Sequence, residues 1–281
     1  MILLIGFELG SFSICFLLMP NREVAVRFII ISAVMAGVLL YGLSLCYLNC
    51  NSLLFNKINQ TSLIGNVLII SFFFFKLGLM PFHTWMIDVY EQAPLGLVMF
   101  FDTFWKLFMV IIFAKVFKVL EYGQVNAVLE IFAISSMLIG SIMAIFQNNI
   151  KRFIAYTSVG HIGFIMTVFI ISSQIVHAIT YALSYAFASV CFFISLQSLK
   201  RRIETFDDLA GTMNENPITG IGLIISMFAM IGMPPFINFT AKLQILKLQI
   251  ETQYYTILAI SIIYSILCIL YATKTMKVFN K

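Results

Sequence analysis

Residues 71–82 read SFFFFKLGLMPF and place one charged side chain, Lys76, inside an otherwise apolar run. Lys106 in FFDTFWKLFMV and Lys242 in FINFTAKLQIL repeat this arrangement in two further apolar segments. A lysine near the centre of a bilayer costs about 2.5–3.5 kcal/mol on insertion scales. Chains keep such residues where the side chain faces a polar interior and handles protons or ions. We therefore expect the three lysines to be functional.

Two of these apolar segments carry a glycine and a proline in the same order. Residues 78–82 and residues 232–236 both fit the pattern G-x-x-P-F. Proline removes a backbone donor and clashes with the preceding turn, so each helix should break at this point. Paired broken helices indicate an internally repeated transporter with an ion site beside the breaks. A match this short can also arise by chance, so the repeat is a hypothesis.

The composition predicts an all-α polytopic membrane protein. Of the 281 residues, 61% are hydrophobic and only 10% are charged, whereas a soluble chain carries about 25% charged residues. Runs long enough to cross a hydrocarbon core of about 30 Å number about nine. They lie at about 2–19, 25–48, 62–83, 96–118, 126–147, 153–172, 174–199, 218–248 and 254–275. The segment HTWMIDVYEQAP, residues 83–94, is expected to be a connector.

Basic residues predict the orientation of these spans, because Lys and Arg collect on the cytoplasmic or matrix side. Ten of them fall on one side and four on the other. The richer side holds Arg22, Arg27, Lys151, Arg152, Lys200, Arg201, Arg202, Lys274, Lys277 and Lys281. We therefore expect the C-terminus on that side. No basic leader precedes the first apolar run, and no cleavable signal is expected.

Four stretches give the chain a resemblance to a known family. They are FELGSFSICFLLMPNREVAVRFIIISA, FKLGLMPFHTWMIDVYEQAP, QNNIKRFIAYTSVGHIGFIM and FDDLAGTMNENP followed by MIGMPPFINFTAK. In this order they resemble chain 2 of NADH–ubiquinone oxidoreductase, the family of antiporter-like membrane-arm subunits of the respiratory NADH dehydrogenase. The resemblance runs from about residue 6 to residue 275. It implies a location in the mitochondrial inner membrane, with the C-terminus on the matrix side.

The resemblance implies two inverted five-helix repeats, each with one broken helix. The first repeat, residues 1–118, is incomplete, and the second covers residues 119–281. The broken helix at 62–83 is third in its half, whereas the one at 218–248 is fourth, so one helix is missing from the first half. The chain begins at the family's glutamate-bearing helix. The earlier helices are therefore expected to be lost or to be supplied by a separate polypeptide.

The resemblance also implies a proton path of five residues. The family's membrane glutamate corresponds to Glu8, and its lysines correspond to Lys76, Lys106 and Lys242. His161 corresponds to a histidine in the family's tenth span. The implied function is proton translocation coupled to electron transfer elsewhere in the complex, with Glu8 as the partner of Lys76.

Each of these residues also has a structural interpretation. Glu8 lies near the terminus and could extend to the interface, and its pairing with Lys76 could be purely structural. His161 could be a hydrogen-bonded interior residue. Asp102 precedes Lys106 by four residues on the same helical face, where relatives usually carry a small polar residue. A fixed pair with Asp102 would hold Lys106 protonated, whereas a relay needs both of its protonation states.

The chain carries no motif for a redox centre. It has no G-x-G-x-x-G pattern, no P-loop and no C-x-x-C cluster, and its five cysteines lie mostly in apolar runs. We expect no cofactor and no metal in this chain, with NAD, FMN, iron–sulfur clusters and ubiquinone in partner subunits. Expected partners are other membrane-arm subunits and lipids, and no nucleic acid. Two alternatives are a stand-alone cation/proton antiporter and a structural subunit that does not pump.

Overall fold

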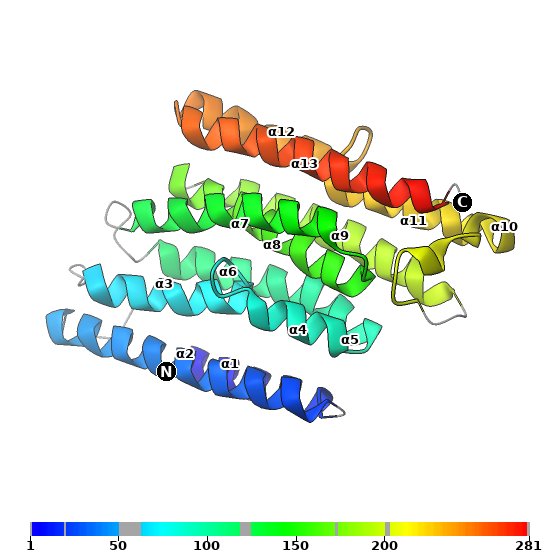
Figure 1. Cartoon of the computed structure of the whole chain (residues 1–281). Coiled ribbons are helices and arrows are strands. Elements are labelled where there is room, and N and C mark those ends of the chain that lie inside the picture. The colour runs from blue at the N-terminus through cyan, green and yellow to red at the C-terminus, as the bar shows by residue number, and fades with distance from the viewer. Residues whose placement is uncertain are drawn as a thin grey trace.

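The computed structural model describes residues 2–19, 21–50, 63–118, 125–171, 174–199 and 203–279, and its regular elements there are helices (Figure 1). The first half contains α1 Ile2–Leu17, α2 Arg22–Cys50, α3 Leu63–Leu77, α4 Thr84–Gln92, α5 Leu95–Phe100, the π-helical turn Phe101–Trp105 and α6 Lys106–Phe117. The second half contains α7 Asn126–Phe146, α8 Ile150–Ile171, α9 Ile175–Ser198, the short helices Asp207–Leu209 and α10 Thr212–Glu215, then α11 Pro217–Ile231, α12 Ile237–Glu251 and α13 Tyr255–Phe279.

Helix length and composition confirm the predicted all-α polytopic fold. Within the described residues, six helices are long and apolar enough to cross a membrane. They are Arg22–Leu48, Leu95–Phe117, Asn126–Phe146, Ile150–Ile171, Ile175–Ser198 and Tyr255–Thr273. Shorter apolar helices occupy Ile5–Leu17, Leu63–Leu77 and Pro217–Ile231. The total of nine spans stays a prediction.

Helix α8 forms the centre of the protein, with 94% of its most apolar window buried. Its neighbour α7 approaches it closely, because glycines lie where the two backbones meet. A Cβ atom on Gly140 would lie 2.7 Å from the backbone nitrogen of Gly160, and one on Gly163 would lie 2.8 Å from the carbonyl oxygen of Ala133. Small residues allow this close packing of helices in membranes. The arrangement buries His161, which lies on α8.

Both predicted helix breaks are present. Helix α3 ends at Leu77, and α11 ends at Ile231. The residues that follow, Gly78 and Gly232, have positive φ angles of 74° and 80°, a left-handed conformation that favours glycine. Figure 1 shows that α3 and α4 run in one direction and that α11 and α12 run in the opposite direction. The two broken helices are therefore inverted relative to each other.

The prediction that residues 83–94 form a connector is wrong for most of this segment. Residues Thr84–Gln92 form α4, which packs against α2 and α8 and buries Trp85 and Tyr90. The break at Gly78 interrupts the helix without ending the span, because the apolar face of WMIDVY allows it to resume. The first broken helix therefore has two halves, like the second.

Two of the basic residues that predict the orientation also bind the end of α4. The Lys151 ammonium donates to the carbonyl oxygen of Ala93 (2.7 Å), and the Arg152 guanidinium pairs with Glu91 (3.0 Å). A cation near the C-terminal end of a helix is favourable for the helix dipole. Four other basic residues used for the orientation lie outside the described residues: Lys200, Arg201, Arg202 and Lys281.

Candidate functional site

The three lysines singled out in the sequence are all buried, with exposed fractions of 2% for Lys76 and 5% for both Lys106 and Lys242. Buried ammonium groups need partners, since an unpaired polar group in an apolar interior is costly. The groups that bind the ammonium differ among the three lysines.

Lys76 lies at the end of α3, where hydroxyl groups from two other helices reach it. Its ammonium donates to the hydroxyl oxygens of Ser11 on α1 (2.6 Å) and Ser32 on α2 (2.9 Å). The Ser32 hydroxyl in turn donates to Ser11 (3.0 Å). The rings of Phe72 and Phe75 lie 5.4 and 5.5 Å from the ammonium nitrogen. All four of these contacts of the Lys76 ammonium are with uncharged groups.

Glu8 lies one helical turn before Ser11, on the same side of α1. Its Oε1 atom is buried and has no hydrogen-bond partner among the described residues. Within the same part of the chain, no ion pair joins Glu8 to Lys76. The serines, and not Glu8, accept the hydrogen bonds of Lys76. Because Ser11 binds Lys76 and lies one turn from Glu8, the two side chains belong to one region of the protein without an ion pair between them.

Lys106 forms the buried ion pair that its spacing predicted. Its ammonium nitrogen lies 2.7 Å from Oδ1 of Asp102, four residues earlier. Hydroxyl groups of Tyr90 on α4 (3.5 Å) and of Tyr185 on α9 (3.2 Å) donate to the same carboxylate, as does Ser189 on α9. Asp102 lies in the π-helical turn that joins α5 to α6, and such turns are frequent at functional sites. Sequence reasoning found the pair but not its hydroxyl partners.

Lys242 reaches back from α12 to the end of α11. Its ammonium donates to the carbonyl oxygen of Ile231 (3.3 Å), where α11 ends and its dipole is negative. The rings of Tyr264 and Phe164 lie 5.0 and 5.8 Å from the nitrogen. A cavity of about 200 Å³ adjoins the lysine and includes Ser265 in its lining. Lys242 is thus next to the second break, with space beside it for small ligands or water.

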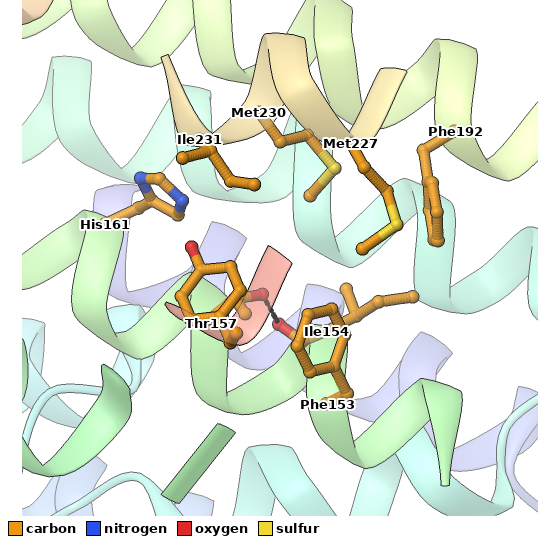
Figure 2. A pocket seen from close by; sticks show the side chains of 9 residues that line it. Phe153, Ile154, Thr157, His161, Phe192, Met227, Met230 and Ile231 are labelled. Atoms are coloured by element: carbon orange, nitrogen blue, oxygen red, sulfur yellow. Dashed lines mark hydrogen bonds between the residues drawn. The ribbon is translucent and has the colours of Figure 1, made fainter. Parts of the chain in front are cut away.

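His161 lies between the second break and α9. Its Nδ1 atom is 2.8 Å from the Tyr181 hydroxyl, and its Nε2 atom is buried without a hydrogen-bond partner among the described residues. The ring centroid lies 4.3 Å from that of Tyr185 and 5.9 Å from that of Tyr264. Figure 2 shows His161 next to Ile231 at one edge of a small cavity of about 10 Å³. That space is close to what one water molecule needs.

Contacts connect Lys106 to Lys242 through the interior. Lys106 pairs with Asp102, which accepts a hydrogen bond from Tyr185. Tyr185 packs on His161, and Tyr264 packs on both His161 and Lys242. Among the described residues no hydrogen bond joins the Lys76 cluster to this set of contacts. The five predicted residues therefore form two groups, Glu8 with Lys76 and the other three.

Helix α9 supplies functional candidates that sequence reasoning missed. Tyr181, Ser184, Tyr185 and Ser189 share one face at helical spacing, which is the only local signal that they carry. Ser184 donates to the side-chain oxygen of Asn238 (2.9 Å), whose amide donates to the Met230 carbonyl oxygen (2.7 Å). This face thus contacts Asp102, His161 and the second break. The described residues contain no group of three or more His, Cys, Asp or Glu side chains that could hold a metal ion.

Inverted broken helices beside buried lysines are typical of membrane transport proteins. Comparison with known proteins shows which family the chain belongs to. The family model described as NADH:quinone oxidoreductase/Mrp antiporter, TM matches residues 1–268. The chain belongs to this family.

The chain is similar in sequence to bacterial members of this family. The chain is 33% identical to the NADH-quinone oxidoreductase subunit N of Pelagibacter ubique over 299 residues, which cover 99% of this chain and 64% of the relative. It is 30% identical to the subunit of the same name from Laribacter hongkongensis, with 98% and 62% covered. The chain therefore spans a little less than two thirds of the length of these relatives.

Solved structures share the fold. A chain of respiratory complex I from Thermus thermophilus superposes with a TM-score of 0.88 at 23% identity, covering 99% of this chain and 65% of that chain. A chain of the archaeal membrane-bound sulfane sulfur reductase gives 0.91 at 20%, covering 99% and 61%. A chain of the Mrp complex from Dietzia sp. gives 0.88 at 18%, covering 99% and 56%. At these identities, the likeness establishes the architecture alone.

Proposed function

We propose that the chain is a proton-translocating membrane subunit of the respiratory NADH dehydrogenase. The observation that carries the proposal is the chain of buried contacts from Lys106 through Asp102, Tyr185 and His161 toward Lys242. Buried ionisable groups in membrane segments mark ion pathways and proton relays. Their arrangement around inverted broken helices suits a transport path that crosses both halves of the protein.

In the proposed mechanism, redox energy released elsewhere in the complex changes the electrostatics near Glu8. Opening of the Glu8–Lys76 charge pair removes the stabilising field of the Glu8 carboxylate from the Lys76 ammonium, and the proton held by Lys76 becomes available. Protons pass through the Lys106 and His161 region to Lys242. The carbonyl end of α11 stabilises the positive charge on Lys242, and the adjoining cavity allows exchange with one side of the membrane.

We further propose that the chain is chain 2 of that complex and lies in the mitochondrial inner membrane, with its C-terminus on the matrix side. The quoted sequence stretches support this choice, whereas the curated relatives named above are bacterial and are called subunit N. Its partners are then other membrane-arm subunits and lipids, and partner subunits of the complex carry NAD, FMN, iron–sulfur clusters and ubiquinone. A separate polypeptide that supplies the family's earlier helices is part of the same proposal.

The repeat boundaries, residues 1–118 and 119–281, are also proposed. The opposite directions of the two broken helices support an inverted repeat. Residues 119–124, where the halves would join, lie outside the described residues.

Replacement of each buried lysine by methionine in the native complex tests the proposed function. We expect Lys76→Met, Lys106→Met and Lys242→Met to reduce the number of protons pumped per NADH oxidised, with the complex still assembled. Lys247→Met is the matched control, because Lys247 is also on α12 but is 77% exposed and, among the described residues, pairs only with Glu251 on its own helix. Assembly is checked by mass spectrometry of the isolated complex. Normal proton stoichiometry after replacing all three lysines would instead establish a structural subunit.

A stand-alone cation/proton antiporter is the second candidate, because the family description and one structural neighbour include Mrp antiporters. The same buried lysines would then exchange H⁺ against Na⁺ or K⁺. Reconstitution of the purified chain in liposomes distinguishes the two functions. Cation-driven proton movement without NADH would favour the antiporter, and its absence, together with recovery of the chain in the NADH-oxidising complex, would favour the subunit.

A further inference from the structure

Asp102 is bound more extensively than an ion pair with Lys106 requires. The carboxylate is almost fully buried, with 1% exposed. Oδ1 accepts from Lys106 and Tyr90, and Oδ2 accepts from Tyr185 and Ser189. A carboxylate has about four lone-pair directions, so these four donors use its whole hydrogen-bonding capacity. Three of the four donors are uncharged hydroxyl groups.

The hydroxyl donors do not move with Lys106. Tyr90 comes from α4, and Tyr185 and Ser189 come from α9, whereas Lys106 begins α6. Removing the only partner of a buried charge leaves an uncompensated ion, which is strongly unfavourable. Hydrogen bonds to the ionised form stabilise it even without the cation. The Asp102 anion therefore stays satisfied when the flexible Lys106 side chain moves away.

We propose that Asp102 is a positioning residue, a fixed counter-ion whose hydroxyl cage of Tyr90, Tyr185 and Ser189 lets Lys106 detach and give up its proton. This inference rests on the proposed function. An N–H bond of the Lys106 ammonium breaks, leaving an amine, and an N–H bond forms at Nε2 of His161, directly or through one water. Asp102 keeps its negative charge throughout. The protonated imidazole then lies against Tyr185, whose hydroxyl binds that same carboxylate.

A permanent, purely structural Asp102–Lys106 pair predicts a different effect of removing the hydroxyl donors. If Lys106 never left Asp102, the hydroxyl groups of α9 would add stability but would not affect the rate of pumping. If Lys106 leaves in every cycle, each missing donor raises the energy of the detached state. The rate of pumping at constant assembly therefore separates the two cases.

The first experiment removes the two α9 donors in the intact complex. Tyr185→Phe with Ser189→Ala keeps the ring that packs on His161 and leaves the Asp102–Lys106 pair in place. We expect assembly to be retained and the pumping rate to fall about tenfold or more, since bonds to charged groups are the stronger ones. Ser195→Ala is the control, because this α9 hydroxyl donates to the Cys191 carbonyl oxygen of its own helix and has no other hydrogen bond among the described residues. Pumping at the wild-type rate in the double variant would overturn the proposal.

Adding Asp102→Asn to the double variant tests whether the lost hydroxyl groups act through the Asp102 charge. If these groups only stabilised the fold, this addition would not restore the pumping rate. A neutral amide needs no compensation when Lys106 leaves, so we expect pumping to recover several-fold toward the wild-type rate. No recovery would mean that the hydroxyl groups act on something other than the Asp102 charge. That result would also overturn the proposal.

Assembly without pumping tests the cage independently of the proposed function. Lys106→Met alone should assemble, because three donors still bind Asp102. Lys106→Met combined with Tyr185→Phe and Ser189→Ala should fail to assemble, and equal assembly of the two variants would contradict the cage. Lys76→Met is measured alongside them. If Lys76→Met pumps normally, the proposed function fails, while the assembly comparison still decides whether the hydroxyl groups support the anion.

Discussion

The two helix breaks both begin at a glycine with a positive φ angle but place their lysines on opposite sides of the break. When the G-x-x-P-F motifs are aligned, Lys76 comes before the glycine of the first break, and Lys242 comes after the proline of the second. The position aligned with Lys242 is Asp88, and the position aligned with Lys76 is Met230. The repeated element is therefore the interruption of the helix. The placement of charge is particular to each half.

The breaks also differ in what satisfies the free carbonyl groups at the end of the first half-helix. At the first break, the Trp85 indole donates to the Phe75 carbonyl oxygen (2.8 Å), and Lys76 takes no part. At the second break, Asn238 donates to the Met230 carbonyl oxygen and Lys242 donates to that of Ile231. The ammonium of Lys242 is thus part of its break. A proton lost from Lys242 would weaken the cap of α11, whereas one lost from Lys76 would change its contacts with two serines and two phenylalanine rings and leave the helix end unaffected.

The largest expected difference between the two breaks is the stability lost when Asn238 at the second break is replaced. Asn238→Leu removes the bonds to Met230 and to Ser184 and leaves a buried carbonyl oxygen without a partner. We expect a loss of on the order of 3 kcal/mol in the free energy of unfolding. The measurement is thermal denaturation of the detergent-solubilised complex, followed by loss of assembled subunit. Thr84→Val is the control, because Thr84 is aligned with Asn238 and is exposed. Equal losses in both variants would remove this distinction between the breaks.

The two glycines give a smaller difference in stability. An alanine at either position must adopt a positive φ, which costs about 1–2 kcal/mol. A Cβ atom at Gly78 would also lie 2.9 Å from the sulfur of Met86, whereas the nearest atom at Gly232 is 3.4 Å away. We expect Gly78→Ala to lower the unfolding free energy by about 1 kcal/mol more than Gly232→Ala. Met86→Ala in the Gly78→Ala background should remove that excess, and an unchanged excess would rule out the contact.

The sequence predicts the parts of this arrangement that depend on neighbours along the chain. Gly78 and Gly232 mark the breaks because a glycine followed by proline acts on the backbone locally. Asp102 and Lys106 are four residues apart, so one helical turn brings them together. Tyr185 and Ser189 are more than 80 residues from Asp102, and only the packing of α9 against the π-helical turn brings them to the carboxylate.

The same limit applies near Lys76. The role of Glu8 as the partner of Lys76 stays a prediction, and the structure adds Ser11 and Ser32 as acceptors of the Lys76 hydrogen bonds. Ordinary serines in apolar helices give no local signal of such contacts. The sequence predicts a connector at residues 83–94, where the structure has α4. Its packing against α2 and α8, which no local pattern reveals, stabilises the second half of the broken helix.

The smallest and most local loss of stability is expected at the contact between α7, in the second half of the protein, and the first break. The Ser136 hydroxyl on α7 accepts the backbone N–H of Met80 (3.0 Å), within the turn after Gly78. Ser136→Ala leaves that N–H without its acceptor and should cost about 1 kcal/mol. The loss should be local, so the Met80 amide should exchange with deuterium faster while amides of α8 keep their protection. Ser141→Ala is the control, since Ser141 is equally buried on α7 but binds only carbonyl oxygens of its own helix. Identical exchange at Met80 in the two variants would show that the first break is held by its own half alone, as the Trp85 contact permits.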